Sequence, residues 1–174
     1  MMGGLVNLID LIFHLASLLF LIRFLLQASS ADYYNSLSQA VIKATDKLAN
    51  PLRGLLKPYK NLDLASIAIA YLFSVAFYFA IFAMMNTVPT WSNLLVMSLA
   101  RTGEIVLSFY WWSILITIIA SYFAQQGVHP AIALLQDIVE PILEPARRLT
   151  VSYTHLRAHE TPEHRVCRGV GEKK

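Results

Sequence analysis

The residues of this sequence with the clearest chemistry are arginines that follow prolines at two places in the chain. Arg53 follows Pro51, and the adjacent Arg147 and Arg148 follow Pro145. Guanidinium groups fork onto phosphate oxygens, so arginines beside a membrane can bind lipid headgroups or acidic partners. The simpler role, which we favour, is that basic residues hold their loops on the cytoplasmic side. The candidate lipid or partner contacts are Lys43, Lys47, Arg53, Arg147 and Arg148.

Metal binding and catalysis find little support in the sequence. The end of the chain carries four nominal zinc ligands, but their spacing fits no usual zinc site. These are His155, His159, His164 and Cys167. The sequence has no phosphate-binding loop, dinucleotide fingerprint or HExxH motif, and no local Ser/His/Asp signature. We therefore expect no catalytic, cofactor-binding or metal-binding residues, and no enzyme activity.

Composition and run length indicate a membrane protein. The sequence is 56% hydrophobic and 14% charged, whereas soluble proteins carry roughly 25% charged residues. An α-helix needs about 20 apolar residues to cross the bilayer core. Residues 5–26, 64–85 and 105–124 supply three such runs. We predict an all-α membrane protein in which these runs are the spans.

Ionisable side chains in or beside these runs need partners, because a charge at the bilayer centre costs about 2.5–3.5 kcal/mol. Asp10 stands near the outer end of the first run, and Arg23 stands near its inner end, where it can snorkel to the headgroups. His14 lies deepest, and we expect it to bond a neighbouring helix and not to relay protons. Arg101 and Glu104 are three residues apart and are expected to pair just outside the third run.

Two amphipathic helices are predicted between and after these spans, over residues of about 35–49 and about 130–144. Asn35 can cap the first helix and Pro130 suits the first turn of the second. Pro51 and Pro145 are expected to stop or bend them. Such helices can lie flat at the headgroups or pack against the inner end of the bundle, and both roles can hold. The apolar stripes are Leu37, Ala40, Val41, Ala44 and Leu48, then Ala131, Leu134, Leu135, Ile138 and Ile142.

These elements form a tandem repeat with an interval of 94 residues, since Pro51 and Arg53 recur as Pro145 and Arg147. The first repeat is predicted over 5–88 and a truncated second repeat over 94–149. The interval places a fourth span near residue 158, but the polar sequence there cannot cross a bilayer, so this span is missing. Residues 150–174 are expected to be a non-native or disordered tail.

Orientation follows from the positive charges. The segment 28–63 holds five Lys and Arg residues, and the segment 86–93 holds none. Loops rich in Lys and Arg stay in the cytoplasm, so we predict a cytoplasmic 28–63 loop and an N-terminus outside. Both repeats then have the same orientation and are parallel.

The order of these motifs resembles the YggT (YlmG) family of small bacterial membrane proteins. Arg23 with Gln27, a later Asn50-Pro51 and an Asp63 before the next span are similar to the family repeat, which usually occurs twice with four spans. The family-motif positions are Arg23, Gln27, Asn35, Pro51, Arg53, Asp63, Pro130, Pro145, Arg147 and Arg148. The first repeat departs from the usual family pattern at Ser36 and Gly54.

The resemblance implies a multi-pass protein of the bacterial inner membrane without cofactors. Its relatives are linked to cell division, nucleoid organisation and membrane-complex assembly, which favours a scaffold or assembly factor. A role in ion or osmotic homeostasis, or in solute transport, is the alternative. The implied partners are membrane lipids, unidentified membrane or cytoplasmic proteins and a second copy of the chain, but no nucleic acid. Residues from about 150 onward resemble a translated sequencing adapter.

Overall fold

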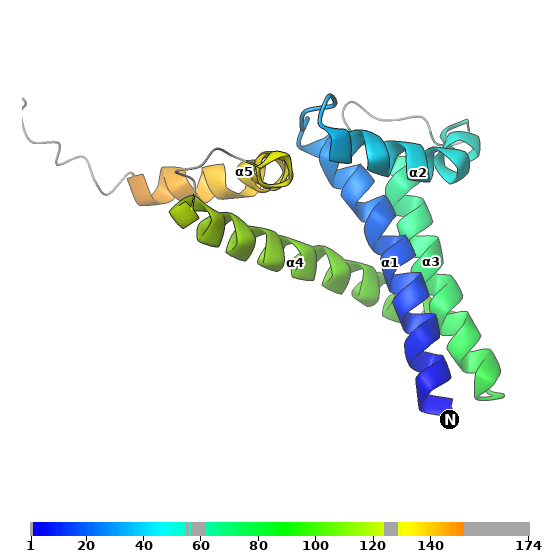
Figure 1. Ribbon diagram of the computed structural model, residues 1–174. Coiled ribbons are helices and arrows are strands. Elements are labelled where there is room, and N and C mark those ends of the chain that lie inside the picture. Colours follow the sequence, from blue (N-terminus) through cyan, green and yellow to red (C-terminus); the bar gives the residue numbers. More distant parts are fainter. Residues whose placement is uncertain (1, 55, 57–61, 124–128, 152–174) are drawn as a thin grey trace, which may run out of the picture. The chain divides into compact units, whose positions relative to one another are not determined.

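The computed structural model describes residues 2–54, 56, 62–123 and 129–151, and these residues form five α-helices and no strand. The predicted all-α class is confirmed. The chain divides into two compact units, Met1–Pro141 and Ile142–Lys174. Figure 1 shows the helices, which are α1 (Met2–Ala28), α2 (Ser36–Arg53), α3 (Leu64–Met84), α4 (Trp91–Phe123) and α5 (Pro130–Val151).

Three of these helices are long and apolar enough to cross a membrane, so the protein is a multi-pass membrane protein. They cover Gly3–Ala28, Leu64–Met84 and Trp91–Tyr122. The third of these spans, α4, begins at Trp91, well before the predicted start at residue 105. Its 33 residues extend about 50 Å at 1.5 Å per residue, which exceeds a bilayer core about 30 Å thick. The position predicted for a fourth span lies outside the described residues.

The span helices pack through small and hydroxyl-bearing residues. Ser17 of α1 donates its hydroxyl to the carbonyl oxygen of Ala70 in α3 at 3.2 Å, and both residues are fully buried. Thr102 of α4 donates to the hydroxyl of Ser74 in α3 at 3.0 Å. In a lipid bilayer the hydrophobic effect does not drive helices together, so close backbone approach and interhelical hydrogen bonds hold them in contact. Leu21 and Ile69 fill the apolar core beside these contacts.

The amphipathic helix α2 begins and ends close to the predicted positions. The side chain of Asn35 accepts a hydrogen bond from the Leu37 amide at 3.0 Å, which confirms the predicted N-cap. The helix continues through Pro51 to Arg53. Because Pro51 lies in the last turn, its missing N–H removes one hydrogen bond without ending the helix there.

The face of α2 that packs on the protein is not its apolar stripe. Ser38, Thr45 and Ala49 are buried, while Leu37 and Leu48 are 42% and 53% exposed. Of the stripe, only Val41 packs into a core cluster. The two roles expected of an amphipathic helix are therefore divided between two adjacent faces, one packed and one open.

The second amphipathic helix, α5, uses its stripe for packing. It begins at Pro130, as predicted, and runs through Pro145 to Val151. Leu134 and Ile138 are buried in a cluster with leucines of α1. Two residues that the periodicity indicated therefore pack, whereas Ile142 of the same stripe is 48% exposed.

Candidate functional site

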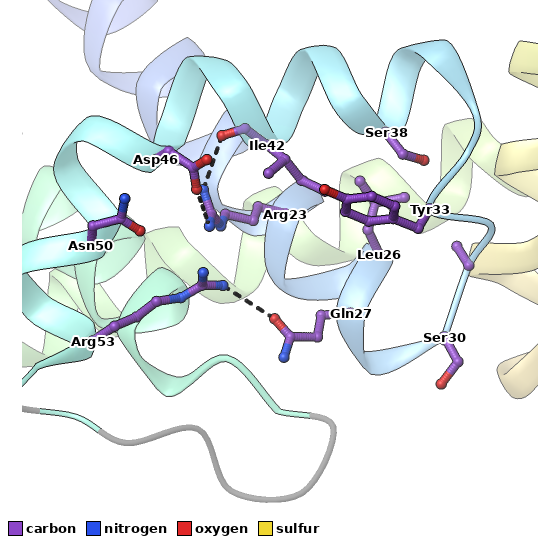
Figure 2. A pocket seen from close by; sticks show the side chains of 11 residues that line it. Arg23, Leu26, Gln27, Ser30, Tyr33, Ser38, Ile42, Asp46, Asn50 and Arg53 are labelled. Atoms are coloured by element: carbon purple, nitrogen blue, oxygen red, sulfur yellow. Dashed lines mark hydrogen bonds and ion pairs between the residues drawn. The ribbon is translucent and has the colours of Figure 1, made fainter.

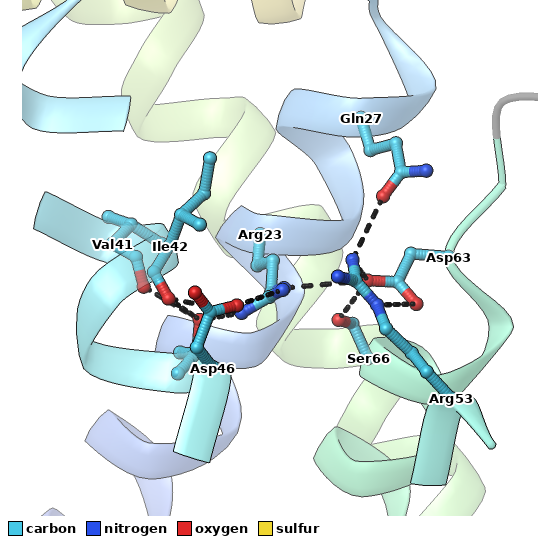
Figure 3. A network of polar contacts seen from close by, with 9 residues as sticks. Arg23, Gln27, Val41, Ile42, Asp46, Arg53, Asp63 and Ser66 are labelled. Atoms are coloured by element: carbon cyan, nitrogen blue, oxygen red, sulfur yellow. Dashed lines mark hydrogen bonds and ion pairs between the residues drawn. The ribbon is translucent and has the colours of Figure 1, made fainter. Parts of the chain in front are cut away.

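A buried carboxylate, Asp63, is the centre of the main polar cluster of the described residues (Figure 3). Asp63 is fully buried and precedes α3. Arg53 donates to it through Nη2 and, at 3.4 Å, through Nε. The Ser66 hydroxyl donates to Oδ2 at 2.7 Å. Asp63 is the N-cap residue of α3, but its side chain makes no capping hydrogen bond and contacts Arg53 and Ser66 instead.

Arg23 of α1 links this carboxylate to α2. Its Nε lies 3.4 Å from Asp63 Oδ2, and its Nη2 lies 2.7 Å from Asp46 Oδ1. Nη1 donates to the hydroxyl of Thr45 at 2.6 Å and to the carbonyl oxygen of Ile42 at 3.1 Å. The expectation that Arg23 snorkels to the headgroups is wrong, since its side chain is 3% exposed. Carboxylates from two other elements neutralise its charge, so it does not need to reach water.

The four charges form a line of alternating sign from Asp46 through Arg23 and Asp63 to Arg53. The two inner groups are buried, and the two ends are partly open, with Asp46 40% exposed and Arg53 33% exposed. Because positive and negative charges are equal in number, the line is neutral overall. It ties together the end of α1, the middle and end of α2 and the start of α3.

Both open ends of this line border a cavity of about 580 Å³ (Figure 2). The wall combines the charged groups with the amides of Gln27 and Asn50, and with the ring of Tyr33. Arg53 also donates to Gln27 Oε1 at 3.4 Å. Ligand cavities typically measure about 300–1,000 Å³, so this space is large enough for a small molecule or headgroup.

Comparison with known proteins places the chain in a family. A sequence model described as CCB3/YggT matches residues 2–84 and 96–155. The chain belongs to the CCB3/YggT family. The resemblance inferred from the motifs is thereby confirmed.

Curated relatives from three bacteria match most of the chain. The uncharacterized protein PA0392 of Pseudomonas aeruginosa is 33% identical over 134 residues, or 76% of this chain and 68% of the relative. An uncharacterized protein in the proC 3′ region of Vibrio alginolyticus is 30% identical, over 85% of this chain and 80% of the relative. The uncharacterized protein YggT of Escherichia coli K12 is 30% identical, over 85% and 77%. No solved structure matches the chain.

The structure brings several CCB3/YggT motif positions into contact. Arg23, Gln27, Arg53 and Asp63 meet in the one cluster, although they belong to three elements. Two further motif positions are in contact, because the Asn35 side-chain amide donates to the carbonyl oxygen of Pro130 at 2.8 Å. These motif residues act as structural contacts within the described protein.

The candidate contact residues divide into two groups. Lys43 and Lys47 are exposed on α2, and Arg147 is exposed on α5. Arg53, in contrast, is bound to Asp63. The exposed residue Arg148 pairs with Glu144 one turn away. Of the candidate contacts on α2, Lys43 and Lys47 are therefore exposed, whereas Arg53 is engaged in the cluster.

Sequence reasoning missed Asp46 as a member of the site. Asp46 lies outside the apolar stripe of α2, and a carboxylate on the polar side of an amphipathic helix is usually solvated. The available signal was the placement of a charged Arg23 in an apolar run, which requires a carboxylate partner. That signal does not identify which acidic residue is near, because the partner comes from another helix.

A second charge pair corrects the expectation for Arg101. Its Nη2 lies 2.7 Å from Oδ1 of Asp10 in α1, and its guanidinium carbon lies 3.7 Å from the centre of the Phe77 ring. The predicted partner, Glu104, is exposed, and the structure records no ion pair for it among the described residues. The pair connects α1 and α4.

Nothing in the described part of the chain groups three or more His, Cys, Asp or Glu residues in a way that could hold a metal ion. The histidines and the cysteine of the predicted tail, His155, His159, His164 and Cys167, lie outside the described residues. His14 is partly buried in α1.

The environment of Asp63 predicts a pH dependence of stability. Burial alone raises its pKa, but hydrogen bonds from Arg53 and Ser66 and the charges of Arg53 and Arg23 outweigh burial and hold the pKa below the ordinary 3.8. A carboxylate with a lowered pKa stabilises the fold above its unfolded pKa, and this contribution is lost as pH falls through the lower folded pKa.

We therefore expect the thermal midpoint in detergent to fall once the pH is lowered below about 4. Circular dichroism between pH 7 and pH 3 measures this, with Asp63→Asn as the comparison. The variant is expected to start from a lower midpoint and to lose less of it between pH 4 and pH 3. Parallel profiles for the two proteins would show that Asp63 is not the group responsible.

Proposed function

We propose that this CCB3/YggT protein is a non-enzymatic scaffold of the bacterial inner membrane, which presents α2 on the cytoplasmic side to a partner protein. Such a scaffold serves cell division, nucleoid organisation or the assembly of a membrane complex. The proposal rests on one observation: α2 is fixed by its buried face and its ion pair, while its remaining faces are open.

The fixation of α2 gives it a defined orientation. Its buried face packs through Thr45 and Ala49, and Asp46 is tied to the buried Arg23. A helix held only by lipid contacts could rotate about its axis, whereas these contacts determine which side chains face outward. Rigid presentation lowers the entropy that a partner loses on docking.

The open faces of α2 differ in chemistry. One carries Leu37 and Leu48, which suit the acyl boundary of a bilayer, and the other carries Lys43 and Lys47. A helix with this division lies along the membrane surface with its lysines toward the water. The excess of Lys and Arg in residues 28–63 favours a cytoplasmic position for this surface. The partner that fits the lysines is an acidic protein surface.

Photo-crosslinking from this surface tests the scaffold. A photoreactive residue in place of Lys47 is expected to capture a discrete protein, and Lys43→Glu should reduce that adduct by about tenfold, whereas Lys43→Arg should preserve it. The same photoreactive residue in place of Leu11, which is 54% exposed on a span helix, is expected to label lipid.

Flux measurements separate the scaffold from the alternative role in ion or osmotic homeostasis. Proteoliposomes are expected to show the same ion and solute leakage as protein-free liposomes. The buried hydroxyls between the spans are bonded to one another or to backbone, as Ser17 and Thr102 show. Flux clearly above background, with no protein adduct at position 47, would overturn the scaffold.

A further inference from the structure

Among the described residues, the wall of the cavity beside Arg53 carries one accessible charge of each sign. Asp46 contributes a carboxylate that is 40% exposed, and Arg53 contributes a guanidinium that is 33% exposed. Arg23 also borders the cavity, but its charge is compensated by Asp46 and Asp63. A ligand therefore meets a negative group and a positive group, with no net charge from the four residues.

This charge pattern disfavours simple ions. An anion attracted by Arg53 would be repelled by Asp46, and a cation attracted by Asp46 would be repelled by Arg53. A zwitterion satisfies both groups. Its ammonium can donate to the carboxylate, and its anionic group can accept the forked donors of the guanidinium.

The uncharged groups of the wall favour phosphate as the anionic part. The amides of Gln27 and Asn50 border the same space as Arg53, and Ser30 is also part of the wall (Figure 2). Phosphate accepts several hydrogen bonds at once, and Arg with amide donors recognises it well. The contact from Arg53 to Gln27 is long at 3.4 Å, so a phosphate oxygen can replace it at small cost.

We propose that this cavity binds a zwitterion carrying an ammonium and a phosphate group, as in the headgroup of an ethanolamine phospholipid. The ammonium pairs with Asp46 and the phosphate with Arg53. A choline headgroup has no N–H to donate to the carboxylate, and a glycerol headgroup has no cation. The inference concerns a site distinct from the exposed lysines of α2 and does not depend on the scaffold.

The position of the cavity favours a membrane lipid over a soluble molecule. Its wall includes Leu26 in the last turns of α1, a span helix that ends at Ala28. The end of a span lies at the level of the headgroups. Leu26 and Ile42 also give the wall an apolar portion that suits the glycerol and acyl ends of a lipid.

Native mass spectrometry of the full chain in detergent tests the site. Dioleoyl lipids with ethanolamine, choline and glycerol headgroups are titrated separately, so that only the headgroup differs. The ethanolamine lipid is expected to bind at least about tenfold more tightly than the other two. Equal binding of the three lipids would overturn the proposal.

Two variants locate the binding. Asn50→Trp fills the cavity without removing any of the four charges, and is expected to abolish the ethanolamine preference while the thermal midpoint stays close to wild type. Asp46→Asn should bring ethanolamine and choline lipids to similar affinity. Lys47→Gln, on the exposed side of α2, is the matched control and should leave the preference unchanged. A preference that survives Asn50→Trp contradicts binding in this cavity.

Competition identifies the source of the zwitterion. If millimolar phosphoethanolamine fails to displace the ethanolamine lipid, the site requires a membrane lipid. If it displaces the lipid from wild type but has no effect on Asn50→Trp, the same cavity accepts the soluble zwitterion. Both results support the recognition chemistry and separate its two sources.

Discussion

Asp63→Asn is expected to lower the free energy of unfolding by about 3–5 kcal/mol, because it leaves the buried Arg23 with only the partly exposed Asp46 as a compensating charge. Asp63 is fully buried, and Arg23 beside it is 3% exposed. The substitution keeps the size of the side chain but removes the negative charge that both Arg23 and Arg53 contact. Loss of one partner in a buried pair costs more than the pair contributes, since the remaining charge has lost its solvation.

Variants of two other ion pairs give stability losses with which the Asp63→Asn loss can be compared. Asp46→Asn is expected to cost less, because Asp46 is 40% exposed and water can solvate the altered contact with Arg23. Arg148→Ala removes an exposed pair within α5 and should change stability by no more than about 0.5 kcal/mol. Denaturation with SDS in mixed micelles, followed by circular dichroism, measures all three. An Asp63→Asn loss as small as that of Arg148→Ala would show that the cluster does not stabilise the fold.

The sequence predicted the elements of this fold better than their contacts. The three apolar runs, the cap at Asn35 and the start of α5 at Pro130 depend on local spacing and backbone chemistry. These features are confirmed. The early start of α4 was missed because Arg101 interrupts the apolar run, although its charge is neutralised in the folded protein.

Contacts between elements could not be predicted in the same way. Motif resemblance pointed to Arg23, Gln27, Arg53 and Asp63, yet nothing in their spacing shows that they meet. The sequence offered Glu104 as the local partner of Arg101, because residues three apart share a helix face. Tertiary packing supplied Asp10 instead.

The faces of the amphipathic helices illustrate the same difference. Hydrophobic periodicity located both stripes, but not what each stripe contacts. In α2 the stripe that includes Leu48 is open, and the smaller residues Thr45 and Ala49 are buried. Small side chains allow a close crossing of helices, which periodicity of large apolar residues does not detect. In α5 two large residues of the stripe, Leu134 and Ile138, are themselves buried.

Asp10→Leu is expected to separate α4 from α1 more effectively than any other single change in this part of the protein. Arg101 is 12% exposed, lies over the Phe77 ring and has Asp10 as its anionic partner. Without the carboxylate, the cation is left among three apolar helices. We expect a loss of about 2–4 kcal/mol in the free energy of unfolding.

The order of effects among related variants is the stronger test. Arg101→Leu should cost less than Asp10→Leu, because the carboxylate that it leaves behind is 47% exposed and can reach solvent. The double variant Asp10→Leu with Arg101→Leu should recover most of the loss, since an apolar pair replaces an ionic one without leaving a buried charge. Glu104→Gln is the control, because this exposed residue is the partner suggested by spacing alone.

The tryptophans make the measurement specific to α4, because Trp91, Trp111 and Trp112 all belong to that helix. Their fluorescence during SDS titration reports its release, while circular dichroism reports the helices as a whole. For Asp10→Leu, the fluorescence transition should move to lower SDS than the circular dichroism transition. If Glu104→Gln shifts the fluorescence as far as Asp10→Leu does, the local pair holds α4. If only Asp10→Leu and, to a smaller extent, Arg101→Leu shift the fluorescence transition, the pair of Asp10 and Arg101 holds α4 against α1.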